Sequence, residues 1–153
     1  MSLELRPFGR FTGELGKVEM VSDTPAGRRY IVGVRAARFT GDRFRATQRG
    51  DSAADWMLVT TDDVAHIDVR LTVRTDDKAL VYVRYCGRAD WSQGHEAAHA
   101  VCAFTFETGA AEYAWLNSAF VVGHGRPGSA GADYELCELS PRQTGNSHDH
   151  AFS

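Results

Sequence analysis

The stretch "HIDVRLTVRTDDKALVYVRY", residues His66–Tyr85, has the pattern of a β-hairpin with two unlike faces. Successive side chains of an extended strand point to opposite faces. A turn at 76–78 places Thr72 opposite Tyr82 and Arg70 opposite Arg84. The apolar face holds Val69, Leu71, Val73, Val81, Val83 and Tyr85. The polar face holds Asp68, Arg70, Thr72, Tyr82 and Arg84. The sequence must therefore place one of these faces inside the protein.

The rest of the chain is also dominated by short strand-like runs between turns. With the hairpin strands at 65–74 and 80–87, the predicted strands lie at 8–15, 29–39, 43–49, 55–60, 102–108, 113–122 and 133–139. Residues 90–101 lack alternation and are predicted to form a short helix or lid. Closure removes the exposed edges of so many strands. We therefore predict an all-β fold, a single antiparallel β-barrel of about eight strands with at most one or two short helices. The barrel domain is expected over 1–140, with a flexible C-terminal tail at 141–153.

Composition is that of an ordinary globular domain. The chain has 153 residues, is 43% hydrophobic and carries a net charge of -3, so no basic surface indicates nucleic acid. We find no apolar segment typical of a signal peptide or membrane span. Three cysteines at unpatterned spacing favour a reduced, cytoplasmic setting. No nucleotide-binding loop or cofactor-lysine motif is present, so no cofactor is expected.

The string "HEAAH" at His95–His99 matches the zinc-binding pattern H-E-x-x-H. On a helix, His95 and His99 would share one face, with Glu96 beside them as a base. A third ligand would have to come from His124, Glu107 or Glu112, and no spacing selects among them. Gly94 directly precedes the motif, and the surrounding chain is mostly strand. We therefore predict no metal site and keep a zinc hydrolase as a lesser alternative.

Five strings in order resemble one family: "TPAGRRY" (24–30), "ADW" (54–56), "DVRLTVRTDDKALVYVR" (68–84), "FETG" (106–109) and "YAWLN" (113–117). Together they are similar to the uncharacterised microbial family known as domain of unknown function 3237 (DUF3237), over about residues 3–139. The resemblance implies a calycin-like or allene-oxide-cyclase-like β-barrel and no established activity. Family members usually have glycine at the position of Lys78, where the hairpin loop favours a positive φ. The chain departs most from the family around 90–101.

The resemblance favours a polar hairpin face that points into the barrel lumen, because the hairpin residues shared with the family are the polar ones. Without it, a solvated polar face around an apolar core is the simpler interpretation. The lumen hypothesis takes Asp68, Arg70, Tyr82 and Asp55 as catalytic. It also assigns substrate-binding roles to five further residues, namely Asn117, Trp115, Trp56, Arg84 and Thr72. Asp55 directly precedes Trp56, so alternation decides which of these two side chains faces inward.

Three function classes follow from these residues. The first is a cofactor-independent acid–base enzyme, an isomerase, cyclase or lyase, acting on a small, partly apolar organic molecule in the barrel lumen. The second is a non-catalytic small-ligand-binding barrel, and the third is the zinc hydrolase. A polar lumen would leave the hairpin's valines as an outward apolar patch, so a homo-oligomer, a dimer in the first instance, is expected.

Overall fold

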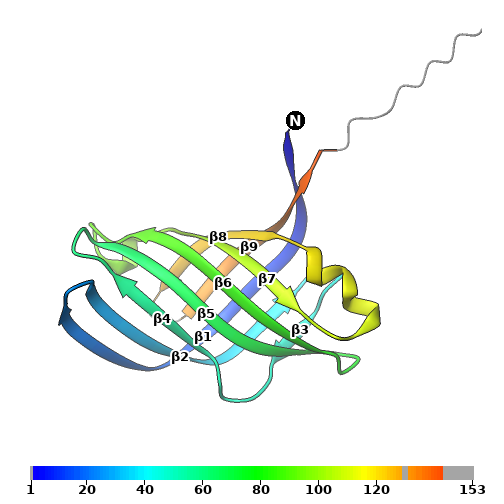
Figure 1. The fold of residues 1–153 in the computed structure, drawn as a ribbon, viewed down its shortest axis with the longest axis horizontal. Coiled ribbons are helices and arrows are strands. Elements are labelled where there is room, and N and C mark those ends of the chain that lie inside the picture. The colour runs from blue at the N-terminus through cyan, green and yellow to red at the C-terminus, as the bar shows by residue number, and fades with distance from the viewer. Residues whose placement is uncertain (1, 129–130, 143–153) are drawn as a thin grey trace, which may run out of the picture.

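The computed structural model describes residues 2–128 and 131–142, and within them nine strands form one antiparallel sheet (Figure 1). The strands are β1 (Leu3–Thr24), β2 (Gly27–Thr40), β3 (Ala46–Gln48), β4 (Ala54–Val59), β5 (Val64–Thr75), β6 (Leu80–Asp90), β7 (Ala100–Glu107), β8 (Val121–Gly128) and β9 (Gly131–Pro141). Two 3₁₀ helices, η1 (His95–Ala97) and η2 (Ala111–Ser118), complete the described part. The predicted all-β barrel is confirmed.

The long strand β1 closes the ring. Its first half pairs with β9, from Leu3 to Gly13, and its second half pairs with β2, from Arg10 to Thr24. On the other side, β2 pairs with the short strands β3 and β4, and both of these pair with β5. The remaining strands follow in sequence as neighbours from β5 to β9. The sheet therefore has no free edge along most of its length.

The β5–β6 hairpin has the predicted register, with Thr72 opposite Tyr82 and Arg70 opposite Arg84. Lys78 in its turn has a φ of 72°, the positive value expected there. The predicted orientation, however, is wrong. The alternate residues that are buried are the apolar ones, Ile67, Val69, Leu71, Val73, Val81, Val83 and Tyr85. The polar face made of Asp68, Arg70, Thr72, Tyr82 and Arg84 therefore points away from the barrel interior.

The physical reason lies in the rest of the core. Phe11 sits at its centre, with ring centroids 4.9 Å from Phe39, 5.6 Å from Phe104 and 5.3 Å from Tyr85. Burying aliphatic side chains against these rings is favourable, whereas burying two arginines there would leave their charges without water. Much of the interior is thus a packed core of aromatic and aliphatic side chains. The premise of an outward valine patch is wrong, so a dimer no longer follows from this hairpin.

The segment predicted as a strand at 113–122 is instead η2 followed by the start of β8. η2 lies at one end of the barrel, where the yellow coil stands in Figure 1. Its Leu116 is fully buried, and Trp115 packs against the core beside Phe8, with ring centroids 6.2 Å apart. The apolar residues of "YAWLN" therefore cap the barrel end rather than alternate along a strand.

The flexible tail was predicted over 141–153. Pro141 is the last residue of β9, and the backbone N–H of Arg142 donates to the carbonyl of Ser2. Residues 143–153 lie outside the described residues. Among the described residues, no helix is long and apolar enough to cross a membrane.

Candidate functional site

A cavity of about 460 Å³ lies toward the barrel end opposite η2. Trp91, which lines it, follows the last residue of β6, whereas Tyr113 of η2 bonds to Asp77 in the β5–β6 turn. Its lining residues come from seven strands and from the segment that follows β6. Its wall is mainly aliphatic, with side chains such as Val32, Val34 and Val69. The polar and aromatic side chains that line it are Tyr30, Asp55, Tyr85, Trp91, His95 and Tyr134. An apolar cavity of this size with a few polar groups suits a small organic ligand.

Asp55 on β4 is the one carboxylate that lines this cavity in the described part of the chain. Side chains on β4 alternate between the two faces of the sheet. Asp55 faces the cavity, whereas its neighbour Trp56 is 39% exposed and Ala54 is half-buried. Its Oδ1 accepts a hydrogen bond of 3.0 Å from the backbone N–H of Asp68. Burial raises the pKa of Asp55 to about 6, against the smaller lowering effect of that hydrogen bond. The charge of Asp68 raises it slightly further. This carboxyl group therefore exchanges its proton near neutral pH.

Two tyrosines share the cavity with this carboxylate. Tyr85 on β6 and Tyr134 on β9 are both buried. Burial raises the pKa of Tyr85 well above its usual value, and the charges of Tyr134 and Asp55 raise it further. Burial also raises the pKa of Tyr134, as do the neighbouring Cys102 thiol and Asp55. Both phenols therefore stay protonated and can donate hydrogen bonds to a bound oxygen atom.

Replacing Asp55 by asparagine is expected to stabilise the protein at pH 8 and not at pH 4. The folded state binds this proton more tightly than the unfolded chain, so stability falls as pH rises from about 3.8 to about 6. Asparagine keeps the acceptor oxygen and cannot ionise. Allowing for contact with water, we expect a gain of about 1–3 kcal/mol at pH 8, which raises Tm by about 2–10 °C. Thermal unfolding at both pH values measures it, and an equal change at pH 4 and pH 8 would contradict the raised pKa.

Asp68 forms an ion-pair cluster on the outer face instead. Its Oδ1 accepts from Arg84 Nε at 3.2 Å, and its Oδ2 lies 3.3 Å from Arg70 Nη2. Partial burial acts to raise the pKa of Asp68. The hydrogen bond and charge of Arg84, the charge of Arg70 and the Cys86 thiol outweigh it and lower the pKa. Asp68 therefore stays ionised among solvated cations, and its side chain does not reach the cavity that holds Asp55.

The remaining predicted substrate-binding residues are dispersed. Trp56 lies on the outer face, where the Arg70 guanidinium stands 5.6 Å from its ring centroid. Trp115 lies at the η2 end under Arg43, 4.5 Å from its ring centroid. Asn117 accepts from the Thr108 N–H at 2.8 Å and donates to the Thr108 carbonyl at 3.0 Å, so it fixes the loop before η2. The structure thus brings none of these three into the cavity with Asp55.

The "HEAAH" string does not form the helix that zinc binding requires. η1 is a single 3₁₀ turn, and Ala98 after it is extended. His95 lies at the cavity mouth, whereas His99 Nε2 lies 3.1 Å from His124 Nδ1 on the outer face of β8. In the described part of the chain, no group of three His, Cys, Asp or Glu residues could hold a metal ion. The motif's residues therefore do not fit the zinc site of a hydrolase.

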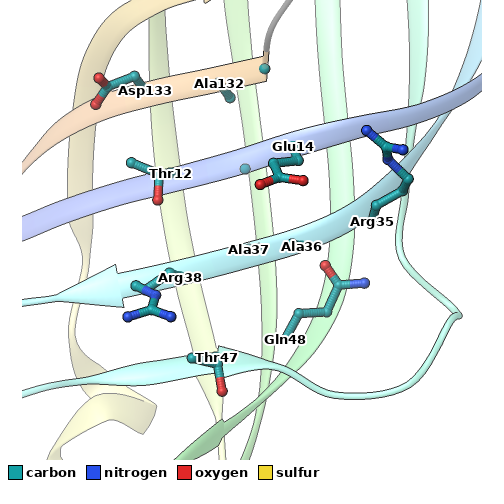
Figure 2. A pocket seen from close by; sticks show the side chains of 12 residues that line it. Thr12, Glu14, Arg35, Ala36, Ala37, Arg38, Thr47, Gln48, Ala132 and Asp133 are labelled. Carbon is teal, nitrogen blue, oxygen red and sulfur yellow. The ribbon is translucent and has the colours of Figure 1, made fainter.

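A second hollow, of about 470 Å³, lies on the outer face of β1, β2, β3 and β9. Figure 2 shows its side chains, with Glu14 and Thr12 from β1, Arg35 and Arg38 from β2, and Asp133 from β9. These charged groups are exposed, so water and salt screen them. We therefore take the mainly apolar cavity around Asp55, rather than this charged outer hollow, as the candidate site.

Tyr30, Tyr85, Trp91 and Tyr134 were not among the residues singled out in the sequence. A usable signal was the hydroxyl of Tyr85 on the otherwise aliphatic face of the hairpin. A buried tyrosine usually places its hydroxyl beside a polar partner, which points to a polar spot inside the barrel. Trp91 lies in the loop after β6, so its position depends on how that loop folds over the barrel end.

Known proteins share this fold over nearly their whole length. A β-barrel-like protein from Acinetobacter baumannii is 25% identical, with a TM-score of 0.81 over 92% of this chain and 98% of that one. A protein of unknown function from Clostridium acetobutylicum is 18% identical, with a TM-score of 0.82 over 91% and 100%. A structure named as an enzyme from Penicillium herquei is 19% identical, with a TM-score of 0.66 over 91% and 94%.

No curated protein sequence matches the chain. Residues 3–139 match the family described as "Protein of unknown function (DUF3237)", which is the span of the resemblance noted from the five strings. This match covers all nine strands except the last residues of β9, and thus the whole cavity. The chain therefore belongs to the DUF3237 family.

Proposed function

We propose that this protein is a cofactor-independent acid–base enzyme, an isomerase, cyclase or lyase, that acts on a small, partly apolar organic molecule inside the barrel. The observation that carries the proposal is Asp55, a carboxylate with a pKa of about 6 in a mainly aliphatic cavity. A base is most effective when its pKa lies near the working pH. Perturbed carboxylates in cavities are also more common at functional sites than elsewhere.

The chemistry follows from three side chains. Ionised Asp55 takes a proton from a carbon atom next to a substrate carbonyl, and the electron pair of the broken C–H bond moves to the carbonyl oxygen. Tyr85 or Tyr134 donates a hydrogen bond to that oxygen and stabilises its negative charge. Protonated Asp55 then returns the proton to a different atom of the substrate. The net reaction is an isomerisation, with no external oxidant or reductant.

A non-catalytic binding barrel is the second candidate, favoured by the mainly aliphatic wall of the cavity. One protein with this fold, from Penicillium herquei, is named as an enzyme. That likeness is one of fold, so the choice between catalysis and binding depends on Asp55 itself.

The test uses 2-tetralone, a neutral ketone with acidic C–H bonds, as a probe of the base. In deuterated buffer, the C1 protons of 2-tetralone are expected to exchange faster with the protein present than with the same concentration of acetate. The rate should rise with pH through about 6 and level off above it, because only ionised Asp55 accepts a proton. Mass spectrometry measures deuterium incorporation. Binding of the ketone with no exchange above the acetate rate would favour the binding barrel.

A further inference from the structure

Asp55 and Tyr85 stand in one row across three neighbouring strands. Asp55 on β4 lies opposite Val69 on β5, and Val69 lies opposite Tyr85 on β6. Residues directly opposite each other in an antiparallel sheet point to the same face, with Cβ atoms about 4.5–5.5 Å apart. All three side chains line the cavity, so Val69 lies between the carboxylate and the phenol on the cavity wall.

Each end of this row has a polar atom that is open to a ligand. The Asp68 N–H holds Oδ1 of Asp55, whereas Oδ2 has no partner in the described part of the chain. The hydroxyl of Tyr85 also bonds to no described residue, although Tyr85 is only 3% exposed. Neither oxygen is among the four unpaired side-chain atoms that the described residues seal from solvent. Both oxygens are therefore reached from the cavity that these residues line.

Tyr134, the other buried phenol of the cavity, stands outside the row. It comes from β9, which pairs with β1 and β8 and not with the strands of the row. After burial, the Cys102 thiol has the largest effect on the pKa of Tyr134, and Asp55 has the smallest. The pKa of Tyr85 is raised more by the charge of Asp55 than by Cys102. Tyr85 is thus the phenol more closely associated with the carboxylate.

The ring of Tyr85 is fixed by its packing. It stacks on Phe104, with ring centroids 4.4 Å apart, and meets Phe11 edge-on at 5.3 Å. A donor that is already in place stabilises a developing negative charge without reorganising during the reaction. This is the property that an oxygen-binding catalytic group needs.

We propose that Asp55, Val69 and Tyr85 form the catalytic row of this cavity, in which Tyr85 donates to the substrate oxygen and Val69 limits the size of the group on the reacting carbon. This rests on the proposed function and adds its oxygen-binding residue and a limit on its substrates. Asp55 Oδ2 takes the proton from a carbon that lies over Val69, and the electron pair of the C–H bond moves to the oxygen bound by Tyr85. Substrates are those whose reacting carbon has no bulky substituent against Val69.

The first test measures exchange of 2-tetralone in deuterated buffer at saturating ketone. Tyr85→Phe keeps the stacked ring and removes the hydroxyl, so the rate above pH 6 should fall about 10²-fold. That rate should still rise through about 6, because Asp55 remains. Tyr134→Phe should lower it by less than about 10-fold, as loss of one neutral hydrogen bond does. Tyr113→Phe removes a hydroxyl that bonds to Asp77 at the η2 end and should exchange like the parent.

The second test compares 2-tetralone with 1-methyl-2-tetralone, each as the ratio of protein-catalysed to acetate-catalysed exchange at C1. The parent should disfavour the methylated ketone by about 10-fold or more, because a packed wall accepts an added methyl group only with strain. Val69→Ala should reduce this preference at least about 3-fold, and Val69→Ile should widen it. Val73→Ala makes the same deletion on the same face of β5, at a buried residue that does not line the cavity, and should leave it unchanged.

A loss in Tyr85→Phe no greater than that in Tyr134→Phe would overturn the row, as would a preference that Val69→Ala and Val69→Ile both leave unchanged. If Asp55→Asn abolishes exchange while Tyr85→Phe retains it, the row is wrong and the base proposal stands. If Tyr85→Phe loses exchange while Asp55→Asn retains it, the base assignment is wrong and Tyr85 keeps its role. If the parent exchanges neither ketone faster than acetate, the base proposal fails and the row fails with it.

Discussion

Asp55→Asn is expected to lower the catalysed exchange of 2-tetralone by about 10²–10⁴-fold. The amide has nearly the shape of the carboxylate and still accepts the hydrogen bond from the Asp68 backbone, but it cannot take a proton. Because the same change removes a partly buried charge, the variant should be at least as stable as the parent at neutral pH. Loss of activity without loss of stability separates a base from a structural residue.

Two other carboxylates serve as controls for this variant. Asp76 lies exposed in the β5–β6 turn at the other end of the barrel, so Asp76→Asn should exchange like the parent. Asp68→Asn removes the outer-face cluster with Arg70 and Arg84, which is worth at most about 1 kcal/mol. It also removes a charge that slightly raises the pKa of Asp55. If Asp68→Asn abolished exchange while Asp55→Asn retained it, the polar face of the hairpin would be the site after all.

The register of the β5–β6 hairpin could be predicted from its own residues, but its orientation could not. Period-two alternation and the turn at Asp76–Lys78 are local properties, and they gave the pairing of Thr72 with Tyr82. Which face is buried depends on what the other strands place inside. The rings of Phe11, Phe39 and Phe104, far away in the chain, make that interior apolar.

Asp55 was the one predicted catalytic residue whose side chain lies in the cavity. Alternation on β4 left two possibilities, Asp55 inward with Trp56 outward or the reverse. A tryptophan is the usual choice for the interior. Here Trp56 instead lies beneath the Arg70 guanidinium on the outside, which leaves the small carboxylate facing the cavity.

The segments without alternation were the hardest to predict. "YAWLN" has aromatic residues spaced as on a strand, yet it folds as η2 because Leu116 and Trp115 cover the barrel end. "HEAAH" has the spacing of a zinc-binding helix, but only three of its residues form a 3₁₀ turn. In "YAWLN" tertiary packing against the barrel overrides the local pattern. In "HEAAH" the 3₁₀ turn buries no residue, and β7 begins at Ala100, directly after the motif.

Phe11→Ala is expected to cost about 3–5 kcal/mol of unfolding free energy. Phe11 is only 1% exposed, and its ring contacts Tyr85, Phe104 and Tyr134 as well as Phe39. Removing it leaves a void in the packed core beside Tyr85 and Tyr134, which line the ligand cavity, and paired strands can close such a void only in part. A fall in Tm of about 6–20 °C should follow. Urea unfolding measures the free energy directly.

Phe120→Ala is the matched control, because it deletes the same atoms from a side chain that is 44% exposed. It should cost less than about 1 kcal/mol, since the backbone carbonyl of Phe120 keeps its bond from the Leu139 N–H. If Phe11→Ala does not fold, Phe11→Leu retains much of the volume and should still cost about 1–2 kcal/mol. Because Phe11 supports Tyr85 and Tyr134, its loss should also lower the catalysed exchange of 2-tetralone, which Phe120→Ala should not do. Equal costs at the two positions would mean that the aromatic rings do not form the packed interior on which the cavity rests.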